Sequence, residues 1–132
     1  MILANGLDSD ANDCKETARL VAEELKDILS PDDWYFAFQS QGMSGPWIGP
    51  TVEDTVTQRK ASGYDTIVIQ PVGFLCDHIE ILYGIDIHFQ SVARELGLKL
   101  VRAESLNDSP LLIDALADLV VNTGSHDLAL AG

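Results

Sequence analysis

Five ionisable side chains lie close together in a stretch that is otherwise apolar. Within PVGFLCDHIEILYGIDIH, residues 71–88, they are Asp77, His78, Glu80, Asp86 and His88. Carboxylate and imidazole groups exchange protons and bind first-row metal ions. The stretch begins where an apolar strand is predicted to end, and open α/β sheets bind ligands beyond the carboxyl ends of their strands. The cluster is therefore a candidate site for proton transfer or metal binding.

The same residues also fit a purely structural interpretation. Asp77 and Glu80 have the spacing of a capping box with Asp77 as the N-cap, which alone would explain both carboxylates. Glu80, Gly84 and His88 are four residues apart and would share one helix face, whereas His78 and Glu80 would point in different directions. Spacing alone leaves both interpretations open.

Three stretches in the same order resemble the ferrochelatases, the enzymes that insert ferrous iron into a porphyrin. They are FQSQGMSGPWIGPTVEDT at 38–55, PVGFLCDHIEILYGID at 71–86 and RAESLNDSPLLIDALADLV at 102–120. The resemblance is to the C-terminal part of that family only. It implies that the substrates are a porphyrin and ferrous iron.

The resemblance also implies roles for the ionisable cluster. Glu80 would accept pyrrole protons and bind the metal, and Asp77 and His78 would orient groups or relay protons beside it. In the family, acids follow this glutamate along the helix, but Gly84 stands at the first of those positions here. His88 would then be an outer metal ligand, and an exposed surface histidine is the alternative. Asp86 is expected to cap a turn or to be solvated.

The loop at 39–50 is a second candidate region. A porphyrin is a flat apolar disc that needs apolar or aromatic walls and a few polar anchors. Trp47 and Met43 are the expected wall, and Gln39 and Ser40, at the carboxyl end of a strand, are the expected anchors. The alternative for Trp47 is a side chain folded onto the core beneath its own loop.

The elements that position these residues follow from apolar periodicity. Apolar runs predict strands at 1–5, 34–39, 65–70 and 98–102, and helical spacing predicts helices at 13–29, 51–63, 77–96 and from 109 onward. A break is expected near Gly84 and Asp86. The last helix is predicted to bury Leu112, Ala115, Leu116, Leu119 and Val120. The alternation predicts an α/β fold, a doubly wound three-layer sandwich with a parallel sheet of about four strands.

Composition narrows the class of protein. The 132 residues are 46% apolar, which predicts one domain over 1–132. The net charge of −13 argues against nucleic acid and against an anionic membrane surface. We expect no transmembrane segment and a cytoplasmic location, since no apolar run approaches about 20 residues and no signal sequence is recognisable.

The cysteine pattern bears on cofactors. Cys14 and Cys76 form no CxxC motif and are too few for a disulfide framework. Cys76 is expected to be a small buried residue. We expect no iron–sulfur cluster and no permanently bound cofactor, since ferrous iron is a substrate in the family that the chain resembles.

The start of the chain differs most from that family, which has two similar α/β halves with a cleft between them. The histidine that the family carries shortly before this region is absent from MILANGLDSD. We therefore expect a partner, either a missing N-terminal half or a second copy, that covers exposed apolar surface. Weak or absent activity is expected of the isolated chain. The alternatives are a small homodimeric tetrapyrrole chelatase and a non-catalytic porphyrin-binding module.

Overall fold

The computed structural model describes residues 2–5, 12–39 and 49–130, with the backbone alone for 2–5 and 124–130. One parallel sheet has the strand order β2-β1-β3-β4. Its strands are β1 (Ile2–Asn5), β2 (Tyr35–Phe38), β3 (Thr66–Pro71) and β4 (Lys99–Arg102). The helices α1 (Asn12–Glu24), α2 (Val52–Ala61) and the run α3 (Ile79–Tyr83), η2 (Gly84–Phe89) and α4 (Gln90–Glu95) connect the strands. The predicted α/β fold with a parallel sheet is confirmed.

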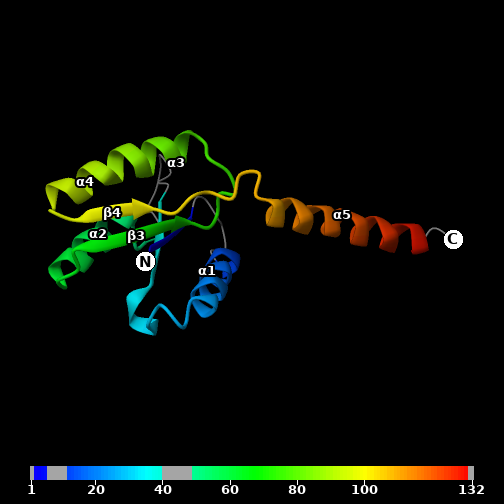
Figure 1. Ribbon diagram of the computed structural model, residues 1–132, viewed down its shortest axis with the longest axis horizontal. Helices are drawn as coiled ribbons and strands as arrows, with labels where there is room; N and C mark the ends of the chain where they lie inside the picture. Colours follow the sequence, from blue (N-terminus) through cyan, green and yellow to red (C-terminus); the bar gives the residue numbers. More distant parts are fainter. Residues whose placement is uncertain (1, 6–11, 40–48, 131–132) are drawn as a thin grey trace.

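The strand order determines which face of the sheet each helix covers. The step from β1 to β2 runs in one direction along the sheet, and the steps to β3 and β4 run in the other. Right-handed crossovers therefore place α1 on one face and the other connecting helices on the opposite face. Figure 1 shows α1 on one side of the sheet, with α3 and α4 on the other. The main core lies on this second side and comprises Ala37, Val52, Val56, Ile67, Ile69, Ile81, Ile85, Phe89, Ala93, Leu98 and Leu100.

Helix ends follow the local sequence signals. The Thr51 side chain accepts a hydrogen bond from the Asp54 N–H at 3.1 Å and so caps α2 at the predicted residue. Gly63 and Gly97 have φ of 93° and 67°, the left-handed conformation that ends a helix. Helix α1 ends at Glu24, before the predicted end at residue 29, because Leu25 opens a turn that leads toward Pro31.

The helical segment after β3 is interrupted where the sequence predicted a break. Between α3 and α4 lies η2, a π-helix over Gly84–Phe89. Ile81 and Ile85 are fully buried and Phe89 is 6% exposed, so the segment keeps one apolar side against the sheet. Single π-helical turns are frequent at functional sites, because they change the direction of the side chains that follow.

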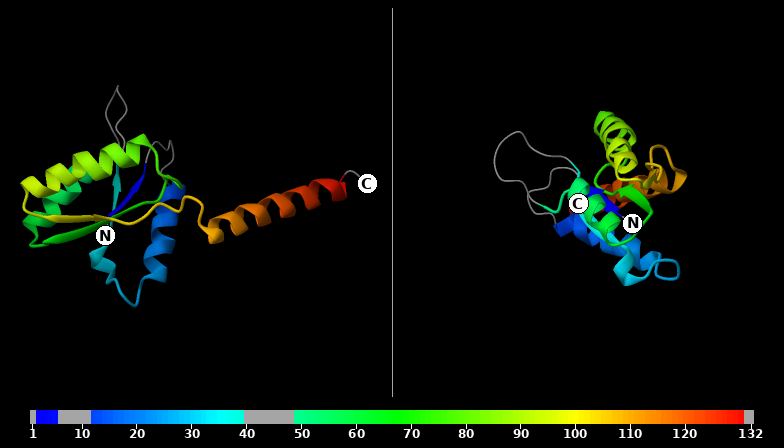
Figure 2. Two further views of the ribbon diagram at one scale, coloured as in Figure 1. Left: turned by 45° about the horizontal axis from the view of Figure 1, so that its top comes forward. Right: turned by 90° about the vertical axis from the view of Figure 1, so that its left-hand side faces the viewer.

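Helix α5 (Pro110–Leu130) contradicts the predicted burial of its apolar side. Figures 1 and 2 show it extending away from the sheet. Leu112 is half-buried, whereas Ala115, Leu116, Leu119 and Val120 are exposed. The helical spacing of apolar residues is real, but it shows only that one side of the helix is apolar. It contains no information about which surface covers that side.

The segment before α5 is tied to the loop between β3 and α3. The Asn107 N–H donates to the Leu75 carbonyl at 2.9 Å, and the Asp77 N–H donates to Asn107 Oδ1 at 2.8 Å. These bonds fix the segment that precedes α5 against the loop between β3 and α3. The α1 side of β3 and β4 is correspondingly uncovered, with Val68 39% and Val101 38% exposed. Across residues 2–5, 12–39 and 49–130, no helix has the length and hydropathy needed to cross a bilayer.

Candidate functional site

The carboxyl ends of the strands border a cavity of about 520 Å³. It lies between the end of β2, the first turn of α2 and the segment α3–η2. Its apolar lining comes from Phe38, Val52, Tyr83, Gly84 and Phe89, and its polar lining from Gln39, Thr51, Glu53, Glu80 and His88. Its volume is in the range of small-molecule sites, and its lining combines apolar and polar residues in equal number.

Glu80 lies in the first turn of α3 and lines this cavity with an exposed side chain. Its backbone is held on both sides. The Glu80 N–H donates to His78 Nδ1 at 3.2 Å, and the Glu80 carbonyl accepts from Gln39 Nε2 at 2.8 Å. The carboxylate is therefore carried at the edge of the cavity by a fixed backbone and stays open to solvent.

Gln39 connects the end of β2 to the start of α3 and is packed against Gly84. A Cβ atom at residue 84 would lie 3.1 Å from Gln39 Nε2. This contact explains why glycine fits at this position, since a longer side chain would displace the Gln39 amide from the Glu80 carbonyl. Gln39 Oε1 is buried and has no hydrogen-bond partner within the described part of the chain.

His88 meets a carboxylate from a different helix. Its Nε2 lies 2.5 Å from Glu53 Oε1, and both side chains are about half exposed. Glu53 belongs to the first turn of α2, which follows β2 and therefore lies at the same edge of the sheet. Glu80, Gly84 and His88 all line the cavity, so the shared face predicted from their spacing is confirmed.

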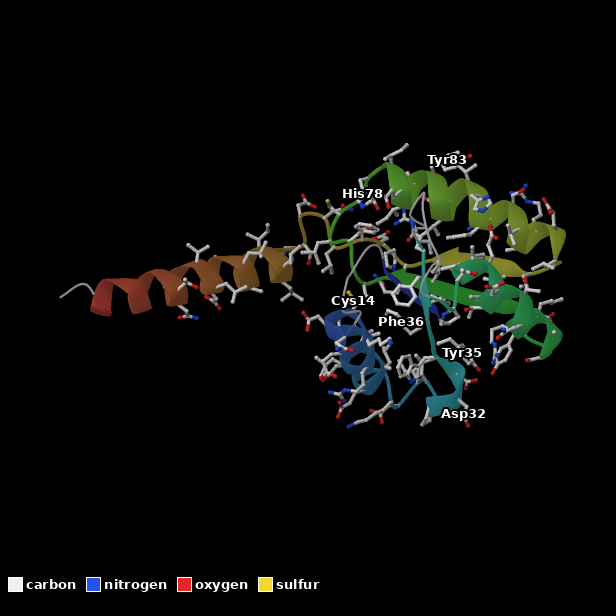
Figure 3. All side chains as sticks on the ribbon, turned by 180° about the vertical axis from the view of Figure 1, so that it is seen from behind. Cys14, Asp32, Tyr35, Phe36, His78 and Tyr83 are labelled. Atoms are coloured by element: carbon white, nitrogen blue, oxygen red, sulfur yellow. The ribbon has the colours of Figure 1, made fainter. Side chains whose placement is uncertain are left out.

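His78 and Asp77 do not line the cavity. The N-cap of α3 is His78, not Asp77, so the predicted capping box is wrong. His78 Nδ1 accepts the Glu80 N–H, which leaves Nε2 as the protonated nitrogen of the neutral ring. The ring packs edge-on against Phe74 with 4.3 Å between centroids. Figure 3 shows His78 at the start of α3 and Tyr83 further along it.

Asp77 is instead the centre of a polar network at the end of β4. Its carboxylate accepts hydrogen bonds from Ser105 Oγ at 2.7 Å and from Arg102 Nη1 at 3.0 Å, and lies 3.4 Å from Asn107 Nδ2. The bond from Ser105 and, after it, those from Asn107 and Arg102 hold the pKa of Asp77 below its ordinary value. Asp77 is therefore an ionised side chain that anchors the loop before α3 through its hydrogen bonds.

Arg102 extends this network to the π-helix. Its Nε donates to Asp86 Oδ1 at 2.7 Å, and its side chain is only 16% exposed. The hydrogen bond to Asp86 and the nearby charges of Asp86 and Asp77 raise the pKa of the guanidinium. Asp86 is thus an ion-pair partner of Arg102 that stays exposed to solvent, a pairing that the sequence did not indicate. The expected burial of Cys76 is wrong, because its side chain is exposed.

The structure brings Gln39, from the second candidate region, together with Glu80 and His88 in one cavity. Trp47, Met43 and Ser40, the other expected pocket residues, lie outside the described residues. Glu53 was not predicted from the sequence. Its position was a usable signal, because it lies in the first turn of the helix that follows the loop at the carboxyl end of β2.

A protein-family model described as Ferrochelatase matches residues 8–123. The chain belongs to the ferrochelatase family. The ferrochelatase of Acidobacterium capsulatum is 61% identical over 108 residues, which are 81% of this chain and 32% of that protein. The ferrochelatase of Herpetosiphon aurantiacus is 46% identical over 100 residues, 75% of this chain and 33% of that protein. The chain thus spans about a third of the length of the curated relatives that it matches.

Two solved structures share the fold of this ferrochelatase-family chain. A CbiX protein from Marinobacter aquaeolei, described under cobalamin (vitamin B12) biosynthesis, has a TM-score of 0.63 and covers 95% of this chain and 97% of its own. The sirohydrochlorin chelatase SirB from Bacillus subtilis, solved with cobalt, has a TM-score of 0.52 and covers 79% of this chain and 42% of its own. Both are 18% identical to this chain, so they establish the fold alone.

Proposed function

We propose that this chain forms the metal-inserting part of a ferrochelatase, which places ferrous iron in a porphyrin during heme biosynthesis. The membership of this chain in the ferrochelatase family supports metal insertion as the reaction. The observation that carries the assignment to this site is the exposed carboxylate of Glu80 at the edge of a cavity that His88 also lines. Both groups are ligands that ferrous iron accepts.

The reaction defines what these side chains must do. Insertion of a divalent ion into a porphyrin releases two pyrrole protons, so the site needs a proton acceptor beside a metal ligand. Glu80 serves as that acceptor and first ligand, because its carboxylate is exposed to the cavity while its backbone is fixed by His78 and Gln39. His88 is the outer ligand on the same face. Ferrous iron is a substrate here and not a resident cofactor.

His78 and Asp77 act on Glu80 indirectly in this proposal. His78 sets the first turn of α3 through its Nδ1, and its Nε2–H remains available to donate. Asp77, held ionised by Ser105, Asn107 and Arg102, fixes the loop that leads into that turn. Gln39 and Ser40 as polar anchors and Trp47 and Met43 as the porphyrin wall remain part of the proposal.

The uncovered surfaces support a second half as the partner of this chain. Ile113, Leu119, Val120 and other apolar side chains of α5 are more than half exposed, and Val68 and Val101 lie open on the sheet. Exposed apolar side chains in such number are typical of an interface. The second half, whether on the same polypeptide or another, would cover these surfaces and close the cleft over the porphyrin.

A stand-alone tetrapyrrole chelatase is the second candidate. The CbiX protein from Marinobacter aquaeolei has this fold over 97% of its own chain, so a chain of this size matches a whole solved chain. A second copy would then supply the other side of the cleft. Light scattering separates the two candidates, because only the stand-alone chelatase requires a dimer of the isolated chain.

A chimera tests the proposed function directly. This chain replaces the matching segment of the Acidobacterium capsulatum relative, and insertion of Zn²⁺ or Fe²⁺ into a porphyrin is followed by absorbance. We expect the chimera to insert metal and Glu80→Gln to lower kcat at least about a hundredfold, the usual effect of removing an acid–base group. Glu24→Gln, on α1 across the sheet, is the charge-matched control and keeps full activity. A folded chimera without activity, or an active Glu80→Gln chimera, contradicts the proposal.

A further inference from the structure

Arg102, at the end of β4, holds two carboxylates that lie on either side of Glu80 in the sequence. Its Nη1 donates to Asp77 Oδ1 at 3.0 Å, just before α3, and its Nε donates to Asp86 Oδ1 at 2.7 Å, inside η2. The arginine side chain is 16% exposed, which is less than either of its partners. One guanidinium therefore joins both ends of the stretch that carries Glu80.

This stretch depends on contacts with the rest of the fold. Helix α3 has five residues and continues into the π-helix η2, and helical segments of this length are not stable without tertiary packing. Ile81 and Ile85 are fully buried and fix which side of the segment faces the sheet. Apolar contacts are not directional, so the finer rotation of the segment about its axis depends on the polar contacts at its flanks.

The polar contacts at the flanks come from the two edge strands of the sheet. At the β2 edge, Gln39 Nε2 donates to the Glu80 carbonyl at 2.8 Å. At the β4 edge, Arg102 holds the two carboxylates described above. The Arg102 backbone pairs in register with the fully buried Ile69 of β3, so its side chain extends from a fixed base. The planar guanidinium then fixes where the two carboxylates lie relative to each other.

We propose that Arg102 is a positioning residue for metal insertion by the Glu80 carboxylate. Through Asp77 and Asp86 it sets the rotation of α3 and η2, and that rotation places Glu80 at the cavity. This inference rests on the proposed function, because it needs Glu80 as the group that accepts protons. It goes beyond that proposal, which fixes only the loop before α3, by adding the attachment at Asp86 on the other side of Glu80.

The contacts of Arg102 distinguish this role from direct binding of the porphyrin's propionates. Its Nε and Nη1 are already engaged with carboxylates, and Arg102 is not one of the residues that line the cavity. Its effect on the reaction therefore passes through the helical segment. A lysine at this position would keep the charge but offer one ammonium group in place of two separate nitrogen donors, so it could not hold both carboxylates in the same relation.

Steady-state metal insertion by the chimera tests the positioning role. The kcat and the porphyrin KM are measured for Arg102→Gln, Arg102→Lys and the matched control Arg94→Gln, which removes an exposed arginine near the end of α4. We expect both Arg102 variants to lower kcat about tenfold to a hundredfold and to change the porphyrin KM by less than about twofold, since a displacement of about 1 Å has effects of this size on rate. Arg94→Gln keeps both values.

The Glu80→Gln background separates positioning from a general loss of folded protein. Glu80→Gln removes the group that Arg102 positions, so adding Arg102→Gln should lower the remaining kcat by less than about twofold. A loss of folded protein would lower kcat by the same factor in both backgrounds, and that result would overturn the inference. A wild-type kcat in Arg102→Gln, or a full rescue by Arg102→Lys, would also overturn it.

Amide hydrogen exchange of the isolated chain tests the attachment at Asp86 without an enzymatic readout, and it applies even if Arg102→Gln does not fold. Asp86→Asn removes only the attachment beyond Glu80, and exchange of the amide protons of residues 79–89 should become faster. Asp27→Asn, which removes an exposed carboxylate after α1, is the charge-matched control and leaves these rates unchanged. Equal exchange rates in Asp86→Asn and the wild type would overturn the inference.

The outcomes also keep the two proposals apart. If Glu80→Gln abolishes insertion while Arg102→Gln inserts metal at the wild-type rate, the proposed function stands and the positioning role of Arg102 fails. If Glu80→Gln inserts metal at the wild-type rate, the proposed role of Glu80 fails, and the positioning role fails with it.

Discussion

The contact between Gln39 and Gly84 predicts an unusual response to a Gly84→Ala substitution. Gly84 has φ of −62° and ψ of −49°, an ordinary right-handed helical conformation inside a continuous helical segment. Alanine in place of glycine there normally stabilises a protein by about 0.5–1 kcal/mol. At this position the added methyl group would meet Gln39 Nε2 at 3.1 Å. Gln39 must then move by a few tenths of an ångström, which stretches its hydrogen bond to the Glu80 carbonyl.

The two effects are of similar size. A hydrogen bond of this kind contributes about 0.5–1.5 kcal/mol net, so its loss offsets the gain from alanine. We expect Gly84→Ala to change the free energy of unfolding by less than about 0.5 kcal/mol in the wild-type background. In a Gln39→Ala background the clash and the hydrogen bond are both absent, and the full gain of about 0.5–1 kcal/mol should appear.

Urea denaturation of the four variants in this double-mutant cycle measures the coupling. The control cycle pairs Gly84→Ala with Gln90→Ala, which removes an amide that donates to the Leu100 carbonyl. The control cycle should be additive within about 0.3–0.5 kcal/mol. If the Gln39 cycle is equally additive, Gln39 does not occupy the space beside Gly84, and our account of this glycine is wrong.

Three further predictions follow from single contacts. Ile85→Ala should destabilise the protein by about 2–5 kcal/mol because Ile85 is fully buried, while Ile87→Ala, at 59% exposure, should cost far less in the same denaturation experiment. Thr51→Ala should cost about 1 kcal/mol through loss of the α2 cap, with Thr57→Ala, exposed on the same helix, as the control. Asp77 has a lowered pKa in the folded state, so its contribution to stability is complete above the ordinary carboxyl pKa and is lost as the pH falls through the folded-state value. Unfolding midpoints measured from pH 6 downward should therefore fall less steeply below about pH 4 in Asp77→Asn than in the wild type, and parallel curves would exclude this role for Asp77.

The fold could be predicted from the sequence because its signals are local. Apolar runs identify four strands, Thr51 begins α2, and Gly63 and Gly97 end helices through their positive φ. The interruption at Gly84 was also visible as a glycine followed by an acid within a helical pattern. Each of these signals lies within a few residues of the structure that it determines, so no long-range contact is needed to interpret it.

What the sequence did not reveal depends on partners that are distant in the chain. Asp77 looked like a helix cap because Glu80 follows three residues later, but its partner Ser105 is 28 residues away. Asp86 pairs with Arg102, and His88 with Glu53, by contacts that only the folded sheet creates. The amphipathic pattern of α5 showed an apolar side but not the surface against which it packs. Local periodicity cannot predict such pairings, because they depend on which elements become neighbours.

The position of a bound metal ion tests the central claim most directly. Crystals of the chimera grown with a porphyrin are soaked in Zn²⁺, and anomalous scattering locates the ion. We predict a zinc ion coordinated by a Glu80 carboxylate oxygen at about 2.0–2.2 Å, on the side facing the porphyrin, and its absence in Glu80→Gln. A zinc ion that faces the porphyrin from other residues, or one that keeps its place in Glu80→Gln, would contradict the role assigned to Glu80.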